Sequence, residues 1–455
     1  MENFGILTLL PTACVITCAL ITHRPILSLL LGVVVGLFMI DPSSIVVNLA
    51  TVAKSQMMLY EIAWVILVCG LFGSLIYILI RTGAALGFAR SMIRLADTRN
   101  KSLIATWFLG ILLFIDDYLN AIAIGASVKK VTDKYKVSRG MLSYIVDSTA
   151  APTCVLVPIS TWAVFFAGVL ESEDLVPNGQ GLAAYISGIP YMFYPIVALL
   201  LVPLVATGRF PLLGLMKKAE AMAAKGIMAL EPTPSIGDDA EPSADEATGV
   251  WDFLVPMLIL IGASVYFISD NNPDTDVLEG AIVALIVTIP YMVFKRLISF
   301  HASLDAVLEG FRVMLPPLAI VVVAFMFKEV NDQIGLPTYV IESVTPYMTP
   351  LMFPVIAFLT MAMVSFATGS SWGIFAIAIP IMVPLGLAVG VDLPIIIGAM
   401  LSASSFGSHA CFYSDATVLS AQSCGLSVME HALTQLPYAV IAALLACALF
   451  IAVSL

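Results

Sequence analysis

The chain has 455 residues, of which 60% are hydrophobic and 11% are charged, and its net charge is −11. A typical soluble chain is about 45–50% apolar and about 25% charged, so this composition excludes a soluble enzyme, a nucleic-acid binder and a disordered protein. Apolar runs of about 20 residues match helices that cross the hydrocarbon core of a bilayer, which is roughly 30 Å thick. The sequence therefore predicts an all-α polytopic membrane protein in contact with the lipid bilayer.

The apolar runs and the positions of Lys and Arg set the expected topology. Basic residues cluster in a few loops, which the positive-inside rule places in the cytoplasm. The first run, 4–22, follows Glu2 and no basic segment, which indicates a spanning helix and not a cleaved signal peptide. Uninterrupted crossings are predicted at 4–22, 26–41, 60–80, 183–208, 252–269, 277–294, 312–330 and 431–454.

Two further segments fit a re-entrant hairpin better than a crossing. Segment 102–128 is long enough to span but has a strongly basic loop at each end, so a single crossing would leave one of these loops outside. A hairpin that enters from the cytoplasm and turns at 115–120 removes this conflict. Segment 351–386, whose apolar arms flank 367–373, predicts a second hairpin that enters from the outer face.

The two halves of the chain follow one plan in opposite orientations. The third helices begin near Tyr60 and Arg312, and the hairpin tips at Asp116 and Thr368 each lie 56 residues further on. This pattern predicts an inverted-topology repeat of about ten transmembrane helices and two hairpins, with helices interrupted at the midplane. The expected parts are a first repeat at 1–210 with hairpin 102–128 and interrupted helix 139–170, a disordered cytoplasmic linker at 211–250, and a second repeat at 251–455 with hairpin 351–386 and interrupted helix 392–428.

The tip of the first hairpin carries adjacent carboxylates in an otherwise apolar segment. Each of Asp116 and Asp117 costs roughly 2.5–3.5 kcal/mol at a helix centre, and two neighbouring acids raise each other's proton affinity. The pair, with Asn120 nearby, is therefore typical of a site that exchanges a cation for protons. The alternative is that one acid caps the N-terminus of a half-helix.

The interrupted helix 139–170 carries a second polar stretch, from Asp147 to Pro152. Proline removes a helix donor and clashes with the preceding turn, which frees carbonyl oxygens near Ser148 beside the Asp147 carboxylate and the Thr149 hydroxyl. Such hard oxygen ligands suit a hard cation. The alternative is a capped kink with no ligand.

The second half supplies two polar stretches with less charge. The hairpin tip contains Thr368, Ser370 and Ser371, while packing is the favoured role of the neighbouring Trp372. In the interrupted segment, the run 414–417 echoes the Asp-x-Thr pattern at Asp147. His409 and Tyr413 lie just before this run, and a histidine can titrate near neutral pH, although a lone histidine is more often a hydrogen-bonded core residue.

These polar stretches together resemble a known family. The resemblance rests on the runs 114–118, 144–152, 159–162, 367–373, 414–419 and 434–438, which follow in the right order over nearly the whole chain. They are similar to the NhaC-type sodium/proton antiporter family of the wider ion-transporter superfamily. The resemblance implies a multi-pass secondary transporter of the bacterial inner membrane that works by alternating access and often forms a homodimer. It implies no cofactor besides the transported or coupling ions, Na+ and H+.

One departure from the family pattern widens the range of substrates. Members commonly have a Gly-Asp step and a Ser-Pro step before the Ser-Asp-x-Thr motif, whereas this chain has Ser408 and Tyr413 at those places. The loss of one carboxylate leaves room for an organic substrate that contacts His409, Tyr413 or Trp372.

Two functional hypotheses follow, and an intramembrane enzyme has little support because HExxH and GxSxG motifs are absent. The first is exchange of Na+ for H+. The second is a Na+- or H+-coupled carrier of a small organic acid or amino acid. The candidate ion-binding residues are Asp116, Asp117, Asn120, Asp147, Ser148, Thr149, Ser414, Asp415 and Thr417, with Na+ expected at Asp147, Thr149, Asp415 and Thr417. The candidate substrate-binding residues are Thr368, Ser370, Ser371, Trp372, His409 and Tyr413.

Overall fold

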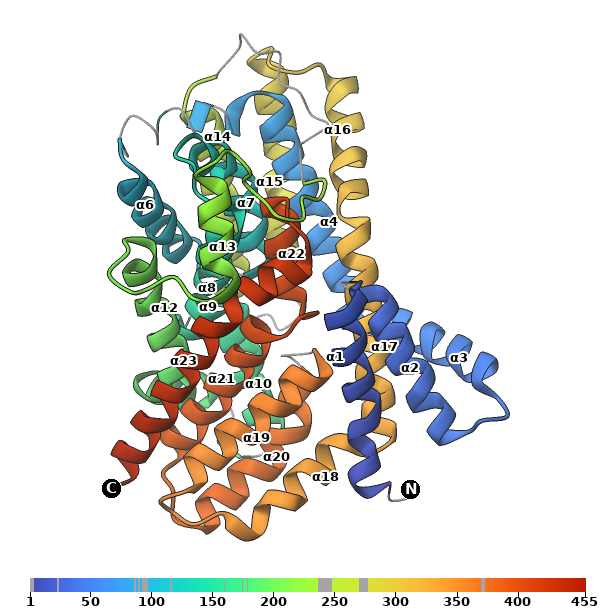
Figure 1. Ribbon diagram of the computed structural model, residues 1–455. Helices are drawn as coiled ribbons and strands as arrows, with labels where there is room; N and C mark the ends of the chain where they lie inside the picture. Colours follow the sequence, from blue (N-terminus) through green and yellow to red (C-terminus); the bar gives the residue numbers. More distant parts are fainter. Residues whose placement is uncertain are drawn as a thin grey trace.

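The regular elements of the molecule are helices. The computed structural model describes the whole chain except residues 1–3, 23, 86, 89–90, 92–96, 115–116, 159, 174, 178, 236–247, 270–276 and 370–372. Within the described part, extended backbone pairs only in an isolated bridge between Pro232 and Leu426. Figure 1 shows the N-terminal helices along one edge of the molecule and the C-terminal helix on the opposite side. The predicted all-α fold is confirmed.

In the first half, most helices cover nearly the same residue ranges as the predicted apolar segments. The stretches 102–128 and 139–170 are broken into shorter helices, as their polar residues indicate. The elements are η1 (Gly5–Leu9), α1 (Leu10–Thr22), α2 (Pro25–Ile40), α3 (Ile45–Met57), α4 (Tyr60–Arg81), α6 (Arg99–Leu112), α7 (Asp117–Lys134), α8 (Arg139–Thr149), α9 (Ala151–Leu156), α10 (Thr161–Ser172), α11 (Gly181–Gly188), η2 (Ile189–Tyr191) and α12 (Phe193–Ala206).

The second half follows a comparable order after a helix in the linker, α13 (Gly214–Ala223). The stretches 351–386 and 392–428 are again broken. The elements are α14 (Trp251–Ser269), α15 (Val277–Phe294), α16 (Phe300–Val313), α17 (Leu315–Gln333), α18 (Leu336–Val344), η3 (Thr345–Tyr347), α19 (Phe353–Thr368), α20 (Gly373–Ala388), α21 (Leu393–Ala410), α22 (Asp415–Cys424) and α23 (Val428–Ser454).

Local capping explains where several of these helices begin and end. Ser138, Ser160 and Ser427 each accept a hydrogen bond from a backbone N–H in the first turn of α8, α10 and α23, which satisfies a donor that has no partner within the helix. Gly369 and Gly425 end α19 and α22 in the left-handed conformation, with φ of 67° and 76°. Glycine adopts this conformation without the steric cost of a Cβ.

The lengths and compositions of the helices fit a protein that crosses the membrane several times. In the described residues, four helices are long and apolar enough to span, and they lie in α4, α15, α21 and α23. The count rises to seven if each strongly bent pair is one span, and the bends are 118° between α2 and α3, 52° before α12, and 40° between α16 and α17. The protein is therefore a multi-pass membrane protein.

Outside the linker, α3 and α16 were not predicted, and each directly precedes the third apolar helix of its half. Helix α16 packs closely on α4, where a Cβ at Gly310 would lie 2.5 Å from the Cα atom of Ser74. The Ser74 hydroxyl also donates to the carbonyl oxygen of Val307 at 2.7 Å. Small and polar residues allow such close helix contacts in membranes, so a polar stretch such as 300–313 forms a packed helix.

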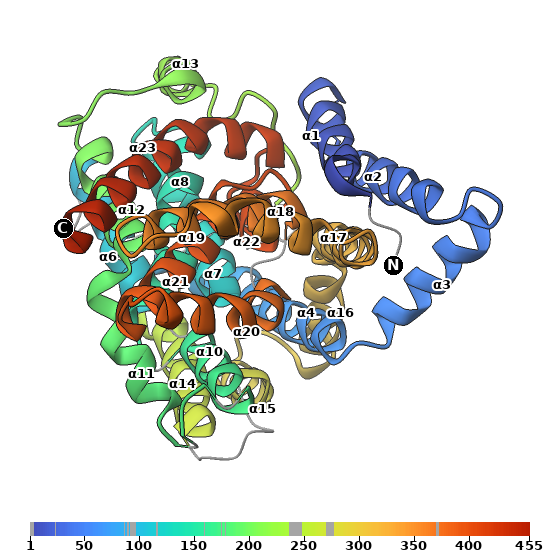
Figure 2. The same cartoon turned by 90° about the horizontal axis from the view of Figure 1, so that it is seen from below.

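The two halves interlock through their hairpins. Helix α7 of the first hairpin packs on α22, and α20 of the second hairpin packs on α10. The second contact includes the rings of Trp162 and Phe375, whose centroids lie 6.1 Å apart. Figure 2 shows α7, α10, α20, α21 and α22 gathered in the body of the molecule, while α1 to α3 stand at its edge beside α17. Each hairpin therefore contacts the interrupted helix of the other half.

Part of the linker is ordered, contrary to the prediction of disorder. Besides forming α13, it runs across the loop between α22 and α23. The Glu430 carboxylate accepts the backbone N–H groups of Leu230 and Glu231 at 3.0 and 2.7 Å, and the Ser235 hydroxyl donates to the Ser423 carbonyl oxygen at 2.9 Å. These partners lie about 190–200 residues away in the sequence. The composition of the linker could not reveal them, and it therefore predicted a disordered segment.

Candidate functional site

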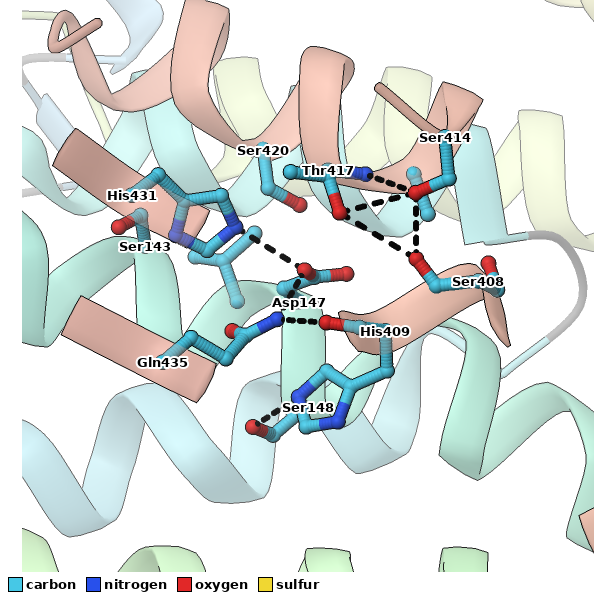
Figure 3. A network of polar contacts seen from close by, with 12 residues as sticks. Ser143, Asp147, Ser148, Ser408, His409, Ser414, Thr417, Ser420, His431 and Gln435 are labelled. Atoms are coloured by element: carbon cyan, nitrogen blue, oxygen red, sulfur yellow. Dashed lines mark hydrogen bonds and ion pairs between the residues drawn. The ribbon is translucent and has the colours of Figure 1, made fainter. Parts of the chain in front are cut away.

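Asp147, in the last turn of α8, is the centre of a buried polar network (Figure 3). The residue is fully buried. One carboxylate oxygen, Oδ2, lies 3.0 Å from Nε2 of His431 and accepts a hydrogen bond from Nε2 of Gln435 at 2.7 Å. Gln435 also donates to the backbone carbonyl oxygen of His409. A buried carboxylate needs such partners, because its desolvation otherwise costs several kcal/mol.

The second carboxylate oxygen of Asp147, Oδ1, has no hydrogen-bond partner among the described residues. In Figure 3 it points away from His431 and Gln435, on the side where Ser408 and Thr417 lie. The hydroxyl of Ser408 is also buried without a partner in this part of the chain. Unsatisfied buried oxygens of this kind cost free energy unless a donor or cation reaches them.

The break between α21 and α22 supplies more oxygen atoms beside Asp147. The Ser414 hydroxyl donates to the Ser408 carbonyl oxygen at 2.5 Å and accepts the N–H of Thr417 at 3.3 Å, which caps α22. The Thr417 hydroxyl lies 3.3 Å from the same carbonyl oxygen. One turn further on, the buried hydroxyl of Ser420 has no partner among the described residues. Carboxylate, carbonyl and hydroxyl oxygens are the ligands that hard cations prefer.

Asp415 belongs to a neighbouring cluster at the tip of the first hairpin. Its Oδ2 accepts a hydrogen bond from the hydroxyl of Tyr118 at 2.5 Å. The adjacent Asp117 accepts one from the indole Nε1 of Trp162 at 3.2 Å. The start of α7 therefore contacts the start of α10 and the start of α22 at once. The predicted site residue Asp116 lies outside the described residues.

The predicted residues Ser148, Thr149 and His409 also lie in this buried region. The Ser148 hydroxyl is 2.8 Å from Nε2 of His409, whose Nδ1 is 2.7 Å from the hydroxyl of Tyr194. The Thr149 hydroxyl donates within its own helix, to the Ile145 carbonyl oxygen at 2.8 Å. The Thr149 atom that contacts a polar side chain of another helix is its backbone carbonyl oxygen, which accepts a hydrogen bond from the Asn120 amide at 2.8 Å. The sequence predicted this role for the hydroxyl instead.

The second hairpin ends against the break between α21 and α22. The hydroxyl of Tyr413 donates to the Ala367 carbonyl oxygen at 2.8 Å, and a Cβ at Gly369 would lie 2.6 Å from the Tyr413 ring. The Thr368 hydroxyl donates to Val364 within its own helix at 2.9 Å. The other predicted residues of this tip, Ser370, Ser371 and Trp372, lie outside the described residues.

The local geometry gives Ser414 a different counterpart from the one the sequence echo indicated. Ser160 caps α10 and donates to the carbonyl oxygen of Cys154, six residues before it, just as Ser414 caps α22 and donates to that of Ser408, also six residues before it. Asp147 instead lies in the last turn of a helix, while Asp415 begins one. The Asp-x-Thr pattern is therefore shared in sequence but not in structural position. The residues in equivalent positions are Ser160 and Ser414, each of which follows a helix break and caps the next helix.

His431 and Gln435, whose side chains contact the Asp147 carboxylate, were not among the predicted site residues. They lie four residues apart and so face the same side of α23. A histidine and a glutamine at this spacing in an otherwise apolar helix were the available signal. Their contact with Asp147 depends on the packing of α23 on α8, which joins segments far apart in the sequence.

Hairpins, interrupted helices and buried carboxylates inside a multi-pass helical protein define a secondary transporter. The chain matches the model of the Na+/H+ antiporter family over residues 172–455. It therefore belongs to the Na+/H+ antiporter family.

Three known proteins show the range of similarity. An uncharacterized protein of Haemophilus influenzae is 26% identical over 469 aligned residues, which cover 95% of this chain and 88% of that protein. The malate-2H+/Na+-lactate antiporter of Bacillus subtilis is 33% identical over 85 residues, which are 19% of this chain and 18% of that protein. The crystal structure of the YdaH transporter of Alcanivorax borkumensis has a TM-score of 0.40 and 14% identity, and the alignment covers 90% of this chain and 88% of that one.

Proposed function

We propose that the protein exchanges Na+ for H+ across the inner membrane of a bacterium by alternating access. The observation that carries this proposal is the Asp147 carboxylate, which is fully buried, held by His431 and Gln435 on one oxygen, and without a described partner on the other. The free oxygen lies on the side of Ser408 and Thr417. The Asp147 carboxylate therefore has nitrogen atoms of His431 and Gln435 on one side and oxygen atoms suited to a cation on the other.

The buried charge gives a physical reason for obligatory exchange. An uncompensated carboxylate in this interior costs several kcal/mol, so Asp147 needs a positive charge in every state that crosses the membrane. A proton shared with His431 supplies one such charge. A Na+ ion at Oδ1, assisted by the oxygens of Ser408, Thr417 and Ser420, supplies the other. Because both ions neutralise the same carboxylate, Na+ entry releases the proton.

The test is transport by the purified full chain in proteoliposomes, with a pH-sensitive dye inside. An inward Na+ gradient should alkalinise the lumen, and Asp147→Asn should abolish this change, because the amide cannot carry the exchanged charge. A matched control is Asp305→Asn, which alters an exposed carboxylate of α16 and should leave the signal intact. Normal Na+-driven alkalinisation by the Asp147→Asn variant would overturn the proposal.

A second candidate function is Na+- or H+-coupled transport of a small carboxylate. The 85-residue similarity to the malate-2H+/Na+-lactate antiporter favours it. So do Ser408 and Tyr413, which stand where the family commonly has a carboxylate and a proline, and the buried His409, which lies beside Ser148. Malate and lactate are the first compounds to test by thermal stabilisation with and without Na+. Stabilisation that needs both Na+ and one of these acids would favour the carrier over the simple exchanger.

A further inference from the structure

Asn120, near the start of α7, lies among three backbone carbonyl oxygens. Its amide nitrogen, Nδ2, is 2.6 Å from the carbonyl oxygen of Gly110, 3.1 Å from that of Leu113 and 2.8 Å from that of Thr149. The side chain is fully buried, and its own oxygen, Oδ1, has no hydrogen-bond partner among the described residues.

Around the Asn120 amide, hydrogen-bond acceptors outnumber donors. A primary amide has two N–H donors, while three carbonyl oxygens surround this one and a fourth oxygen belongs to Asn120 itself. Because buried acceptors without donors are costly, the environment is electronegative. It favours a group of positive charge at the position that Nδ2 now takes.

The C-terminal ends of two helices add to the negative electrostatic potential around the Asn120 amide. Gly110 lies in the last turn of α6, Leu113 is its C-cap, and Thr149 is the last residue of α8. Carbonyl groups at the C-terminus of a helix lack intrahelical donors and carry the negative end of the helix dipole. Two helix C-termini therefore point their carbonyl oxygens at one buried point.

Gly110 allows the two helices to approach closely enough for this arrangement. A Cβ at this position would lie 2.0 Å from the Thr149 hydroxyl oxygen and 2.5 Å from its Cβ. Any larger residue would push α6 away from α8 and separate the carbonyl oxygens. The convergence of the three oxygens thus depends on a glycine in the middle of the contact.

We infer that Asn120 marks a second Na+ site, separate from Asp147. When the Asn120 side chain turns about both its Cα–Cβ and Cβ–Cγ bonds, Nδ2 leaves this point, and Oδ1 joins the carbonyl oxygens of Gly110, Leu113 and Thr149 around a Na+ ion. In the state described here, Nδ2 takes the place of that ion. All four ligands are neutral oxygens, which suits a monovalent cation, whereas Ca²⁺ and Mg²⁺ favour carboxylates.

The two sites share helix α8, because Thr149 lies two residues after Asp147. An ion at the carbonyl site fixes the end of α8 and so the position of the Asp147 carboxylate. The inference rests on the proposed Na+ transport and adds to it that two Na+ ions bind per chain with positive cooperativity. The Hill coefficient for Na+ should then exceed 1 and approach 2.

Equilibrium binding of radioactive Na+ to the purified full chain tests this inference. The wild type should bind two ions, while Asn120→Ala and Asp147→Asn should each bind one. Asn100→Ala, an exposed asparagine at the start of α6, is the matched control and should bind two. If Asn120→Ala fails to fold, Asn120→Asp replaces it. This variant should gain more thermal stability from Na+ than the wild type does, because a carboxylate among three carbonyl oxygens needs the cation.

The outcomes separate this inference from the proposed function. One bound ion in the wild type, lost in Asp147→Asn but kept in Asn120→Ala, would overturn the second site and leave the exchange mechanism standing. No saturable Na+ binding in the wild type would overturn both. An Asn120→Ala variant of lower thermal stability that still binds two ions would show a purely structural amide and would also overturn the inference.

Discussion

Gln435 offers a quantitative test of the Asp147 network. Replacing it with Leu keeps the side-chain size and removes the donor that lies 2.7 Å from Oδ2 of Asp147 and also reaches the His409 carbonyl oxygen. A hydrogen bond to a charged group contributes about 1.5–3 kcal/mol. At 1.36 kcal/mol per factor of ten, its loss should weaken the apparent affinity for Na+, in competition with protons, by about 10- to 150-fold.

The pH dependence of the same variant has a definite sign. The lost donor stabilises the charged carboxylate, so protons compete better with Na+ when it is missing. The pH of half-maximal activity should therefore move to higher pH in Gln435→Leu. The measurement is Na+-driven pH change in proteoliposomes over a series of Na+ concentrations and pH values. Gln333→Leu, which alters an exposed glutamine paired with Glu329, is the matched control.

A small effect would refute this reasoning. Hydrogen bonds between helices in membranes average only about 0.6 kcal/mol, which corresponds to about a threefold change in affinity. If the apparent KM for Na+ in a folded Gln435→Leu variant rises threefold or less, then the Asp147 carboxylate does not carry a full charge when it binds Na+. The exchange mechanism would then need another acid.

Two further variants probe packing and the neighbouring cluster. Gly407→Ala should lower the free energy of unfolding by about 1–3 kcal/mol, because the new Cβ would lie 1.8 Å from the Ser365 hydroxyl oxygen. Gly168→Ala is the control: its Cβ would meet open space, so the free energy of unfolding should rise by up to about 1 kcal/mol. Equal shifts in the melting temperatures of the two variants would contradict this. Tyr118→Phe removes the 2.5 Å hydrogen bond to buried Asp415. It should cost about 1–3 kcal/mol and slow Na+-driven alkalinisation, and unchanged melting and transport would show that Asp415 has other support.

The broad plan of the fold could be predicted because hydropathy and basic loops constrain it directly. The predicted segment 102–128 corresponds to α6 and α7, and 392–428 to α21 and α22. Helices α3 and α16 were missed because they are short or rich in polar residues. Their formation depends on neighbours such as α4 that lie far away in the sequence.

The site could be predicted only where charge marks it. Asp147 stood out as a carboxylate in an apolar helix, whereas the partners of its Oδ2 come from α23, and the oxygen atoms on the side of its unpaired Oδ1 come from α21 and α22. The carbonyl oxygens around Asn120 have no sequence signature at all, because every residue carries one. Only the helix breaks at Leu113 and Ala150 bring them together.

The interlocked hairpins have a consequence for the order in which the protein is made. Tyr118 finds its partner Asp415 297 residues later in the chain. At about 5–20 residues per second, a ribosome needs roughly 15–60 s to synthesise that stretch. During this time the first hairpin has no α22 to pack on. The contacts between α7 and α22 are therefore made only when the last helices enter the membrane, and a chain truncated before α22 would lack them.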